Sequence, residues 1–319
     1  MTDTTEYGLG AIESPPDPRD YPIAALYASL GIEPAEAAAL AARYVHAPMP
    51  VVLNQHATPQ CVAFSAASEQ MAFDQCDQHA WYAFDEGTFF SMIGGGPGGA
   101  DVRVALGVRK ATGYPTVGRN DAGSHRIAAY YTVPKDALSL KQAIYAFGPL
   151  VFSTPWANSW FHPGANGVLP APSGGLAGGH ALVAYGWDDA KGLLLRNSWG
   201  AAWGVAGDAF LPYSQIGTTW SWWRAVDVID VTKTSWTIHV VHGAVVEYPG
   251  VQEPQPGVFR VVPGSTVNRA YTGPAAAFAC SKPVYDPVAK TTLVYVASGL
   301  YRHWVHAAGV GVTVTPSVS

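Results

Sequence analysis

The pattern of the chain changes at Gly148, from runs that suit helices to short runs that suit strands. Three segments before this point suit helices: residues 61–77, 101–113 and 136–148. The runs after it are short and strand-like. They are residues 149–156, 180–188, 192–200, 208–213 and 220–230. Because helices come first and strands later, the sequence predicts an α+β domain with segregated halves over residues 51–231.

Two further regions flank this domain. Residues 1–50 are predicted to form an N-terminal arm, in which the recurring prolines of residues 14–22 exclude a helix. Within the arm, residues 33–45 are predicted to form one short helix, with Pro34 in its first turn. Residues 232–319 hold only strand-like runs and predict a small all-β C-terminal domain.

Charge and composition limit the partners and the compartment. The net charge is −5, so the chain has no basic field for nucleic acid. No stretch of 18 apolar residues exists, and the first residues lack a basic region followed by an apolar run, so we expect neither a membrane span nor a signal peptide. Three cysteines are too few for a disulfide framework and fit a reducing site, either the cytoplasm or an assembled particle such as a virion.

The charged residues make up 13% of the chain, about half of the usual share. Two explanations stay open: a thinly charged soluble protein, or a subunit whose surface is partly covered by partners. The small number of charges in residues 232–319 leaves strand edges poorly protected. We therefore expect this region to dock the chain into an oligomer or a larger particle, unless it only packs on the preceding domain.

A lone thiol lies at the start of the first predicted helix of the α+β domain. Pro59 breaks the chain, and an apolar run begins directly after Cys61, so the positive end of a helix dipole would favour a thiolate there. His180 comes after two glycines on a predicted strand and could take the thiol proton. Asn197 could hold that imidazole in one tautomer, as the third group of a triad does.

These residues and their neighbours resemble the papain-like cysteine peptidases. The segments that carry the resemblance read CVAFS from Cys61, GGHALVAYGWDD around His180 and RNSWGAAWG around Asn197. Gln55 lies six residues before Cys61, the spacing of the oxyanion-hole glutamine of that family. The resemblance covers about residues 50–230. It implies a two-lobed fold, with a helical lobe and a β-barrel-like lobe, that hydrolyses peptide or protein substrates through a Cys61 thioester.

The same resemblance implies a role for each of these residues. Cys61 is the nucleophile, His180 is the general base and then the acid, and Asn197 orients His180. Gln55 donates to the developing oxyanion together with the backbone amide of Cys61. Trp199 covers the contact between His180 and Asn197.

Glycines are expected to line the groove that holds the substrate. Gly95 and Gly96 belong to the glycine-rich run of residues 92–101, which the resemblance aligns with a loop that pairs with substrate backbone. Gly179 precedes His180 on the other wall, and with Trp199 it completes the predicted substrate-binding set. Because these walls carry no charge before Asp101, we expect a preference for an apolar side chain two residues before the cut.

The chain departs from the family pattern around the thiol and ahead of the domain. The residues before Cys61 are Thr58, Pro59 and Gln60, so the first cysteine of the family signature is absent. A long prodomain is also missing, and we expect the arm to brace the domain without being cleaved. We further expect Cys61 and His180 to form an ion pair, with the pKa of Cys61 well below the free-thiol value of about 8.5.

The alternative to a peptidase is a non-catalytic structural or binding subunit with a papain-like fold. A third class, the cell-wall amidases that also use Cys and His, is disfavoured by Gln55 and by the NSWG sequence. No cofactor is expected. The pairs His239/His242 and His303/His306 lie three residues apart on predicted strands, where they face opposite sides, so we expect no metal site.

Overall fold

The structure is a computed structural model of residues 1–319, and its described residues fall into two compact units. The first unit comprises Met1–Tyr27, Glu33–Cys76 and Trp81–Asp227, and most of the second lies in Val228–Ser319. The residues outside the description are 1–5, 31–33, 47–48, 79–80, 120, 228–235, 241–242, 249–250, 256–257, 262–266, 272–275, 281–283, 287–290, 299–300, 307–311 and 317–319. The predicted boundary between residues 231 and 232 falls in one of these gaps and stays a prediction.

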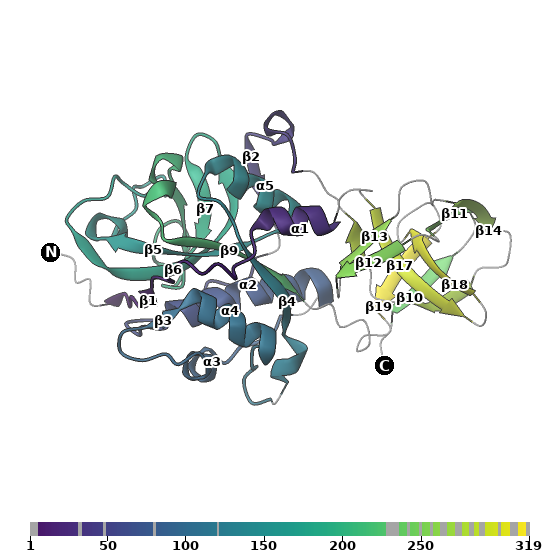
Figure 1. The fold of residues 1–319 in the computed structure, drawn as a ribbon, viewed down its shortest axis with the longest axis horizontal. Helices are drawn as coiled ribbons and strands as arrows, with labels where there is room; N and C mark the ends of the chain where they lie inside the picture. The colour runs from purple at the N-terminus through teal and green to yellow at the C-terminus, as the bar shows by residue number, and fades with distance from the viewer. Residues whose placement is uncertain are drawn as a thin grey trace. The chain divides into compact units, whose positions relative to one another are not determined.

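The three helices predicted from the sequence are present in the first unit (Figure 1). They are α2 (Cys61–Gln78), α4 (Val102–Ala111) and α5 (Ala137–Phe147). The carboxylates of Asp101 and Asp136 cap the last two by accepting backbone N–H bonds. Gly148 ends α5 with a φ of +95°, a conformation that suits glycine. A further helix that we did not predict, α3 (Glu86–Met92), is capped by Asp85.

Seven strands of the first unit form one antiparallel sheet. Its order is β4-β9-β5-β6-β7-β8, and β2 pairs with β6. These strands are β2 (Arg43–Val45), β4 (Ile127–Thr132), β5 (Leu150–Ala157), β6 (Leu176–Asp188), β7 (Gly192–Arg196), β8 (Asp208–Leu211) and β9 (Ser221–Asp227). The β5 strand and the paired part of β6 from Ala181 onward are almost wholly buried, and β6 carries the predicted histidine into the core.

The arm differs from its predicted structure. Residues 14–22 are non-helical, as predicted, but α1 (Ile23–Leu30) comes directly after them. The helix predicted over residues 33–45 is wrong: the described part holds the short 3-10 turn η2 (Ala37–Ala39) and strand β2. The alanine-rich sequence of residues 33–45 favours a helix locally. Residues 43–45 nevertheless form a strand, because they pair with β6.

Short elements complete the first unit. They are β1 (Ala11–Ile12), β3 (Ala100–Asp101) and the 3-10 turns η3 (Ala122–Ser124), η4 (Asn158–Phe161) and η5 (Tyr213–Thr218). No described helix is long and apolar enough to cross a membrane.

The second unit is described only by its strands. They are β10 (Trp236–Val240), β11 (Gly243–Tyr248), β12 (Val251–Gln255), β13 (Val258–Val261), β14 (Val267–Tyr271), β15 (Ala276–Cys280), β16 (Val284–Asp286), β17 (Thr291–Ser298), β18 (Tyr301–His306) and β19 (Val312–Pro316). Their pairing order is β14-β11-β18-β17-β15-β10-β19, with β16 on β17, and β12 pairs with β13.

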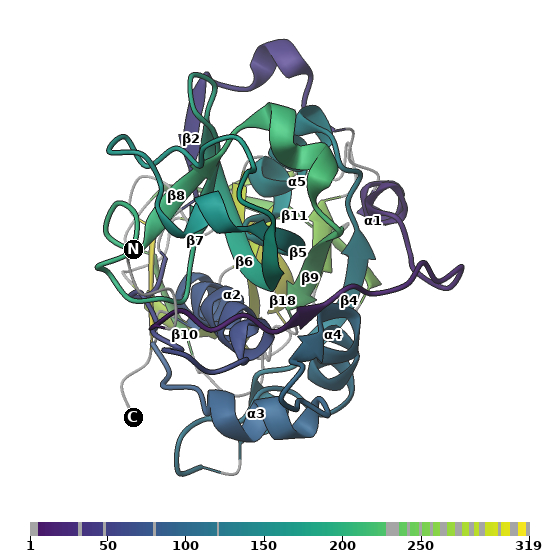
Figure 2. The ribbon, with the colours of Figure 1, turned by 90° about the vertical axis from the view of Figure 1, so that its left-hand side faces the viewer.

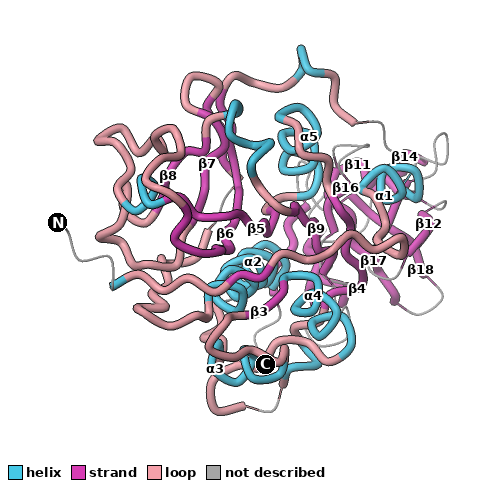
Figure 3. Tube along the Cα trace, turned by 60° about the vertical axis from the view of Figure 1, so that its left-hand side comes forward, coloured by secondary structure: helices cyan, strands magenta, loops and turns pink. Residues whose placement is uncertain are grey.

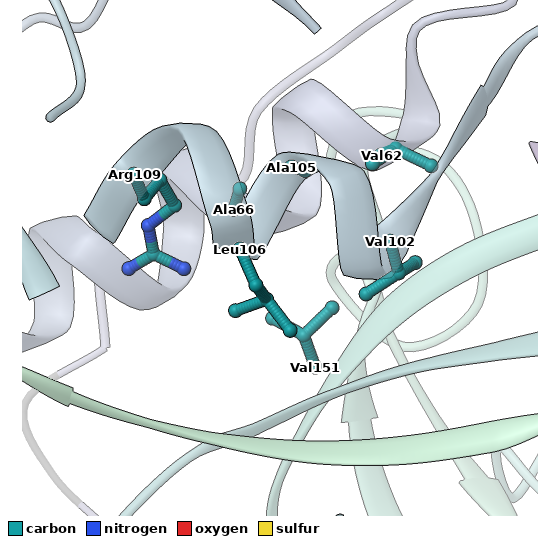
Figure 4. Close-up of a pocket in the computed structure, with 7 residues that line it drawn as sticks. All are labelled: Val62, Ala66, Val102, Ala105, Leu106, Arg109 and Val151. Atoms are coloured by element: carbon teal, nitrogen blue, oxygen red, sulfur yellow. The ribbon is translucent and has the colours of Figure 1, made fainter. Parts of the chain in front are cut away.

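A buried ion pair joins α2 to α4 inside the first unit. Arg109 Nη1 lies 2.6 Å from Glu69 Oε2, and both side chains are fully buried. Arg109 also donates to Gln70 Oε1. Figure 4 shows Arg109 beside a pocket that Val62, Leu106 and Val151 help to line, and this pocket has no room for a water molecule. Water therefore cannot replace either partner of the pair.

We expect Arg109→Met to lower the free energy of unfolding by about 3–5 kcal/mol, because it leaves the Glu69 carboxylate buried and unpaired. Urea unfolding of the full chain measures this change. Arg19→Met is the matched control, since Arg19 pairs with Asp17 at the surface, and it should leave stability unchanged. Equal stability of the two variants would contradict the prediction.

Candidate active site

Cys61 begins α2 and is completely buried. Pro59 ends the preceding loop, and the helix starts with the Phe64 amide donating to the Gln60 carbonyl. The Cys61 thiol lies close to the backbone amides of Ala181 and Gly10. Because Ala181 directly succeeds His180 on β6, the thiol lies against the strand that carries the predicted base.

His180 and Asn197 form a close buried pair. His180 Nε2 lies 2.7 Å from Asn197 Oδ1, and the Ser198 amide donates to the same oxygen. That oxygen accepts, so Nε2 carries the proton and Nδ1 is the unprotonated nitrogen of the neutral ring. Nδ1 has no hydrogen-bond partner among the described residues. It is therefore the nitrogen able to receive a thiol proton.

Trp199 shields this pair from water. Its ring stacks on the His180 ring with centroids 4.3 Å apart and an interplanar angle of 20°. Trp156 contacts both rings edge-on. The ring of Trp199 therefore covers the His180 ring, and its predicted role in catalysis stays a prediction.

Gln55 is held with its amide nitrogen toward the site. Ser198 Oγ donates to Gln55 Oε1 at 2.7 Å, which fixes the orientation of the amide. The Gln55 backbone amide donates to the Ser198 carbonyl, so the loop before α2 is tied to the loop after β7. The structure thus brings all four predicted catalytic residues to one buried place, where α2, β6 and these two loops meet.

A segment of the arm, Tyr7–Ile12, occupies this place; we call it the cleft segment. Figures 2 and 3 show the chain crossing between the sheet and the helices α2 and α4. The Gly8 carbonyl accepts 3.1 Å bonds from Gln55 Nε2 and Trp199 Nε1. The Gly10 amide donates to the Gly179 carbonyl. The cleft segment therefore uses the groups that the sequence assigns to the substrate and its oxyanion.

The other wall contacts the cleft segment through Gly99 and Ala100. The Ala100 amide donates to the Gly10 carbonyl, and β1 pairs with β3 in parallel. A Cβ at Gly99 would overlap the Gly10 carbonyl, and one at Gly179 would overlap the Ala11 carbonyl. Gly95 instead packs on the ring of Phe90, and the space beside Gly96 is open. Substrate binding by Gly95 and Gly96 stays a prediction. The contacts that this run makes with the cleft segment come from Gly99 and Ala100, later in the same run.

The expected ion pair is not present in this closed arrangement. Burial raises the pKa of Cys61 to about 12, and burial lowers the pKa of His180 to about 3. Both groups are therefore neutral at pH 7. The expectation of a low thiol pKa is wrong for this arrangement, because the burial of both side chains disfavours their charged forms.

We expect acid to release the cleft segment. A water-exposed imidazole titrates near 6.5, whereas His180 in the closed site has a pKa of about 3. Below pH 6.5 the open state binds a proton that the closed state does not, so closure weakens by up to about tenfold per pH unit. Hydrogen exchange of the Gly10 amide at pH 7 and pH 5, corrected for intrinsic rates, measures this change.

His180→Gln is the control for this experiment, because it removes the titrating ring. Its Gly10 protection should not depend on pH between 5 and 7. Equal protection of the parent chain at both pH values would contradict the prediction.

Sequence reasoning missed the residues that close the site. Gly8, Gly10 and Tyr7 lie in a short run without periodicity, and Phe161 lies in a 3-10 turn. The alternation of glycine at positions 8 and 10 was the one signal present, since it permits close backbone approach. The prediction that the arm packs on the domain is confirmed for these residues, and whether the arm is cleaved remains untested.

Comparisons with known proteins find similarity to cysteine proteases. Residues 109–214 match the family described as papain family cysteine protease, a range that includes His180 and Asn197 but not Cys61. A gut-specific cysteine proteinase of Caenorhabditis elegans is 35% identical over 99 residues, which cover 30% of this chain and 29% of that protein. Cathepsin 7 of Rattus norvegicus is 31% identical over 98 residues, covering 28% and 30%. The matches span less than a third of the length of these relatives.

A solved structure is similar to a larger part of the chain. Xylellain, a cysteine protease from Xylella fastidiosa, is similar with a TM-score of 0.57 and 22% identity. The likeness covers 69% of this chain and 96% of that one. It confirms the α+β fold that the sequence predicts.

Proposed function

We propose that this chain, which contains a papain-family cysteine peptidase domain, hydrolyses peptide bonds through a thioester on Cys61. The observation that carries the proposal is the hydrogen bond between His180, on strand β6 next to the Cys61 thiol, and Asn197, which follows strand β7. Gln55 adds a fixed donor at the same place. A histidine that only packed in the core would not need a thiol, an orienting amide and an oxyanion donor around it.

In the open enzyme, His180 Nδ1 takes the proton of the Cys61 thiol, and the thiolate attacks the carbonyl carbon of the peptide bond. The carbonyl oxygen becomes negative and accepts bonds from Gln55 Nε2 and the Cys61 amide. The C–N bond then breaks as His180 gives its proton to the leaving amine. Water, deprotonated by His180, attacks the thioester and releases the acid and the thiol.

The cleft segment cannot take part in this reaction as it lies. The Gly10 amide donates to the Gly179 carbonyl, and the Gly10 carbonyl accepts from the Ala100 amide, so both groups are already engaged. Gln55 is already bonded to the Gly8 carbonyl. The chain is therefore an inactive form of the peptidase until the cleft segment moves.

A non-catalytic subunit with a papain-like fold is the second candidate. The observation that favours it is the complete burial of both Cys61 and His180. The two candidates differ in the reactivity of Cys61 once the cleft segment has left, because only a peptidase has an activated thiol to expose.

Labelling with an epoxide or a peptidyl electrophile separates them. The full chain is treated at pH 5 to 7, with and without a Gly8→Ala/Gly10→Ala substitution that disturbs the cleft segment, and intact mass gives the extent and site of labelling. A peptidase should be labelled once, at Cys61, and Cys61→Ala should not be labelled. A chain that stays unlabelled when the segment is displaced would exclude the peptidase.

We also propose that residues 232–319 dock the chain into an oligomer or a larger particle, in the cytoplasm or in an assembly such as a virion. The support is the sparse charge of this strand-rich region, since poorly charged strand edges need cover. Light scattering and pull-down with the full chain test this. A monomer that captures no partner would contradict it.

A further inference from the structure

Arg196 directly precedes Asn197, at the point where strand β7 leaves the sheet. It is the last residue of β7 that is paired in both ladders, with β6 on one side and with β8 on the other. The sheet therefore ends one residue before the amide that orients His180. The side chain of Arg196 makes the contacts that continue from this point.

The guanidinium of Arg196 binds the carboxylate of Asp208 on β8 through two bonds. Arg196 Nε donates to Oδ1 at 2.6 Å, and Nη2 donates to Oδ2 at 3.3 Å. Gly207, the residue before Asp208, accepts the backbone amide of Asn197 at 3.0 Å. A side-chain pair and a backbone bond at adjacent residues thus join the chain at 196–197 to the chain at 207–208.

The same guanidinium reaches two further segments of the site. Its Nη1 donates to the carbonyl of Pro50, in the loop that leads to Gln55. Its carbon Cζ lies over the ring of Tyr185, 5.5 Å from the centroid, and β6 carries both Tyr185 and His180. The Tyr185 hydroxyl also donates to the carboxylate that Arg196 binds. One side chain therefore joins the segments that carry Gln55, His180 and the orienting amide.

These contacts are largely shielded from water. The Arg196 side chain is 10% exposed and the Asp208 side chain is 19% exposed. A charge-assisted pair with two parallel bonds fixes direction as well as distance, and a planar guanidinium can make it where a lysine ammonium cannot. Arg196 therefore restrains the position of the backbone from which the Asn197 side chain extends.

Resting on the proposed peptidase function, we infer that Arg196 is a positioning residue for the reaction, acting through Asn197. It keeps Asn197 Oδ1 against His180 Nε2, the contact that leaves Nδ1 unprotonated for the thiol proton. Without Arg196 the amide shifts, and the imidazole exchanges its tautomer and turns in its site. A misplacement of about 1 Å in such a group costs up to about 10²-fold in rate.

Nitrogen NMR of the full chain with labelled histidine tests the inference without catalysis. In the closed parent chain at pH 7, His180 should show a single tautomer with the proton on Nε2, because Asn197 Oδ1 accepts from it. Arg196→Met should show a mixture of the two tautomers. His180→Gln identifies the signal by removing it.

Kinetics in the Gly8→Ala/Gly10→Ala background give the second measurement. Arg196→Met should lower kcat by roughly 10- to 100-fold and leave KM nearly unchanged. The bond to Asn197 raises the pKa of His180, so its loss should move the basic limb of the profile of kcat/KM to lower pH. A residue that only stabilised the fold would scale the whole profile and leave this limb in place.

Arg196→Lys separates geometry from charge. It keeps the positive charge but cannot bind both carboxylate oxygens and the Pro50 carbonyl together, so it should recover only part of the lost kcat. Full recovery of kcat and of the single tautomer would overturn the inference, because charge alone would then suffice.

Lys141→Met is the matched control. Lys141 is also a shielded cation, 13% exposed, that pairs with an aspartate, Asp189, at 2.7 Å and lies over a ring, that of Trp187, at 5.2 Å. Its removal should leave the tautomer, kcat and the pH profile unchanged, since these contacts do not involve the segment of Asn197.

Asp208→Asn replaces Arg196→Met if that variant does not fold, because it keeps the volume of the side chain and removes one of the two acceptor oxygens. It should give the same mixture of tautomers. A single Nε2–H tautomer in both variants would overturn the inference and leave the peptidase function standing. A mixture of tautomers in a chain that cuts no peptide would support the positioning by Arg196 even as the peptidase proposal failed.

Discussion

Replacing Gly8 and Gly10 by alanine in the full chain should raise the rate of peptide cleavage by roughly 10- to 100-fold at pH 7. A Cβ at Gly8 would overlap the Thr58 carbonyl, and one at Gly10 would overlap the Pro59 carbonyl. Both obstacles are backbone of the loop that leads into α2, so they cannot rotate away. The closed arrangement then costs about 1–3 kcal/mol more, and the open population grows in proportion.

Neither glycine belongs to the catalytic machinery, so a gain in activity reports the release of the cleft segment. Gly217→Ala is the matched control, because a Cβ there meets nothing within 4 Å, and it should leave activity unchanged. Deletion of residues 1–12 should act in the same direction as the double substitution. If the parent chain already cleaves as fast as the variants, the cleft segment does not close the enzyme in solution.

The closed arrangement also explains why the pKa prediction failed while the site prediction agrees with the geometry. Cys61, His180, Asn197 and Gln55 come from short local patterns, and each pattern is anchored to one element of the fold. The acidity of a thiol depends on its burial in the folded chain, which raises the pKa of Cys61 here, and on contacts with distant residues such as Gly10, 51 residues earlier in the chain. No local pattern around Cys61 contains that contact.

The same reasoning applies to the fold. Helices α4 and α5 were predictable because their apolar runs and flanking Asp and Gly residues act within a few positions, and α2 because its apolar run begins shortly after Pro59. The stretch of residues 33–45 was not, since β2 forms only by pairing with β6, more than 130 residues later. Several glycines in residues 92–101 offer the same local signal, so the sequence could not predict that Ala100 and Asp101 are the residues of this run that pair with β1.

With the cleft segment displaced by Gly8→Ala/Gly10→Ala, Cys61→Ala should abolish peptide cleavage, a loss on the order of 10⁴-fold or more, because no other group can form the acyl intermediate. Gln55→Ala should lower kcat by about 10²–10³-fold, since it removes one donor to the oxyanion. The two losses differ in kind: Gln55→Ala should still be labelled by an electrophile at Cys61, and Cys61→Ala should not.

Steady-state kinetics of each variant, with thermal unfolding to verify the fold, measure these losses. Adding His180→Ala to Cys61→Ala should cost nothing further, because the base has no nucleophile left to activate. Ser65→Ala is the control: its hydroxyl donates within α2 to the Val62 carbonyl, so removing it should leave kcat unchanged. If Cys61→Ala still cleaved peptides, the nucleophile would be another residue. If Gln55→Ala kept the full kcat, the Cys61 amide would stabilise the oxyanion without help from Gln55.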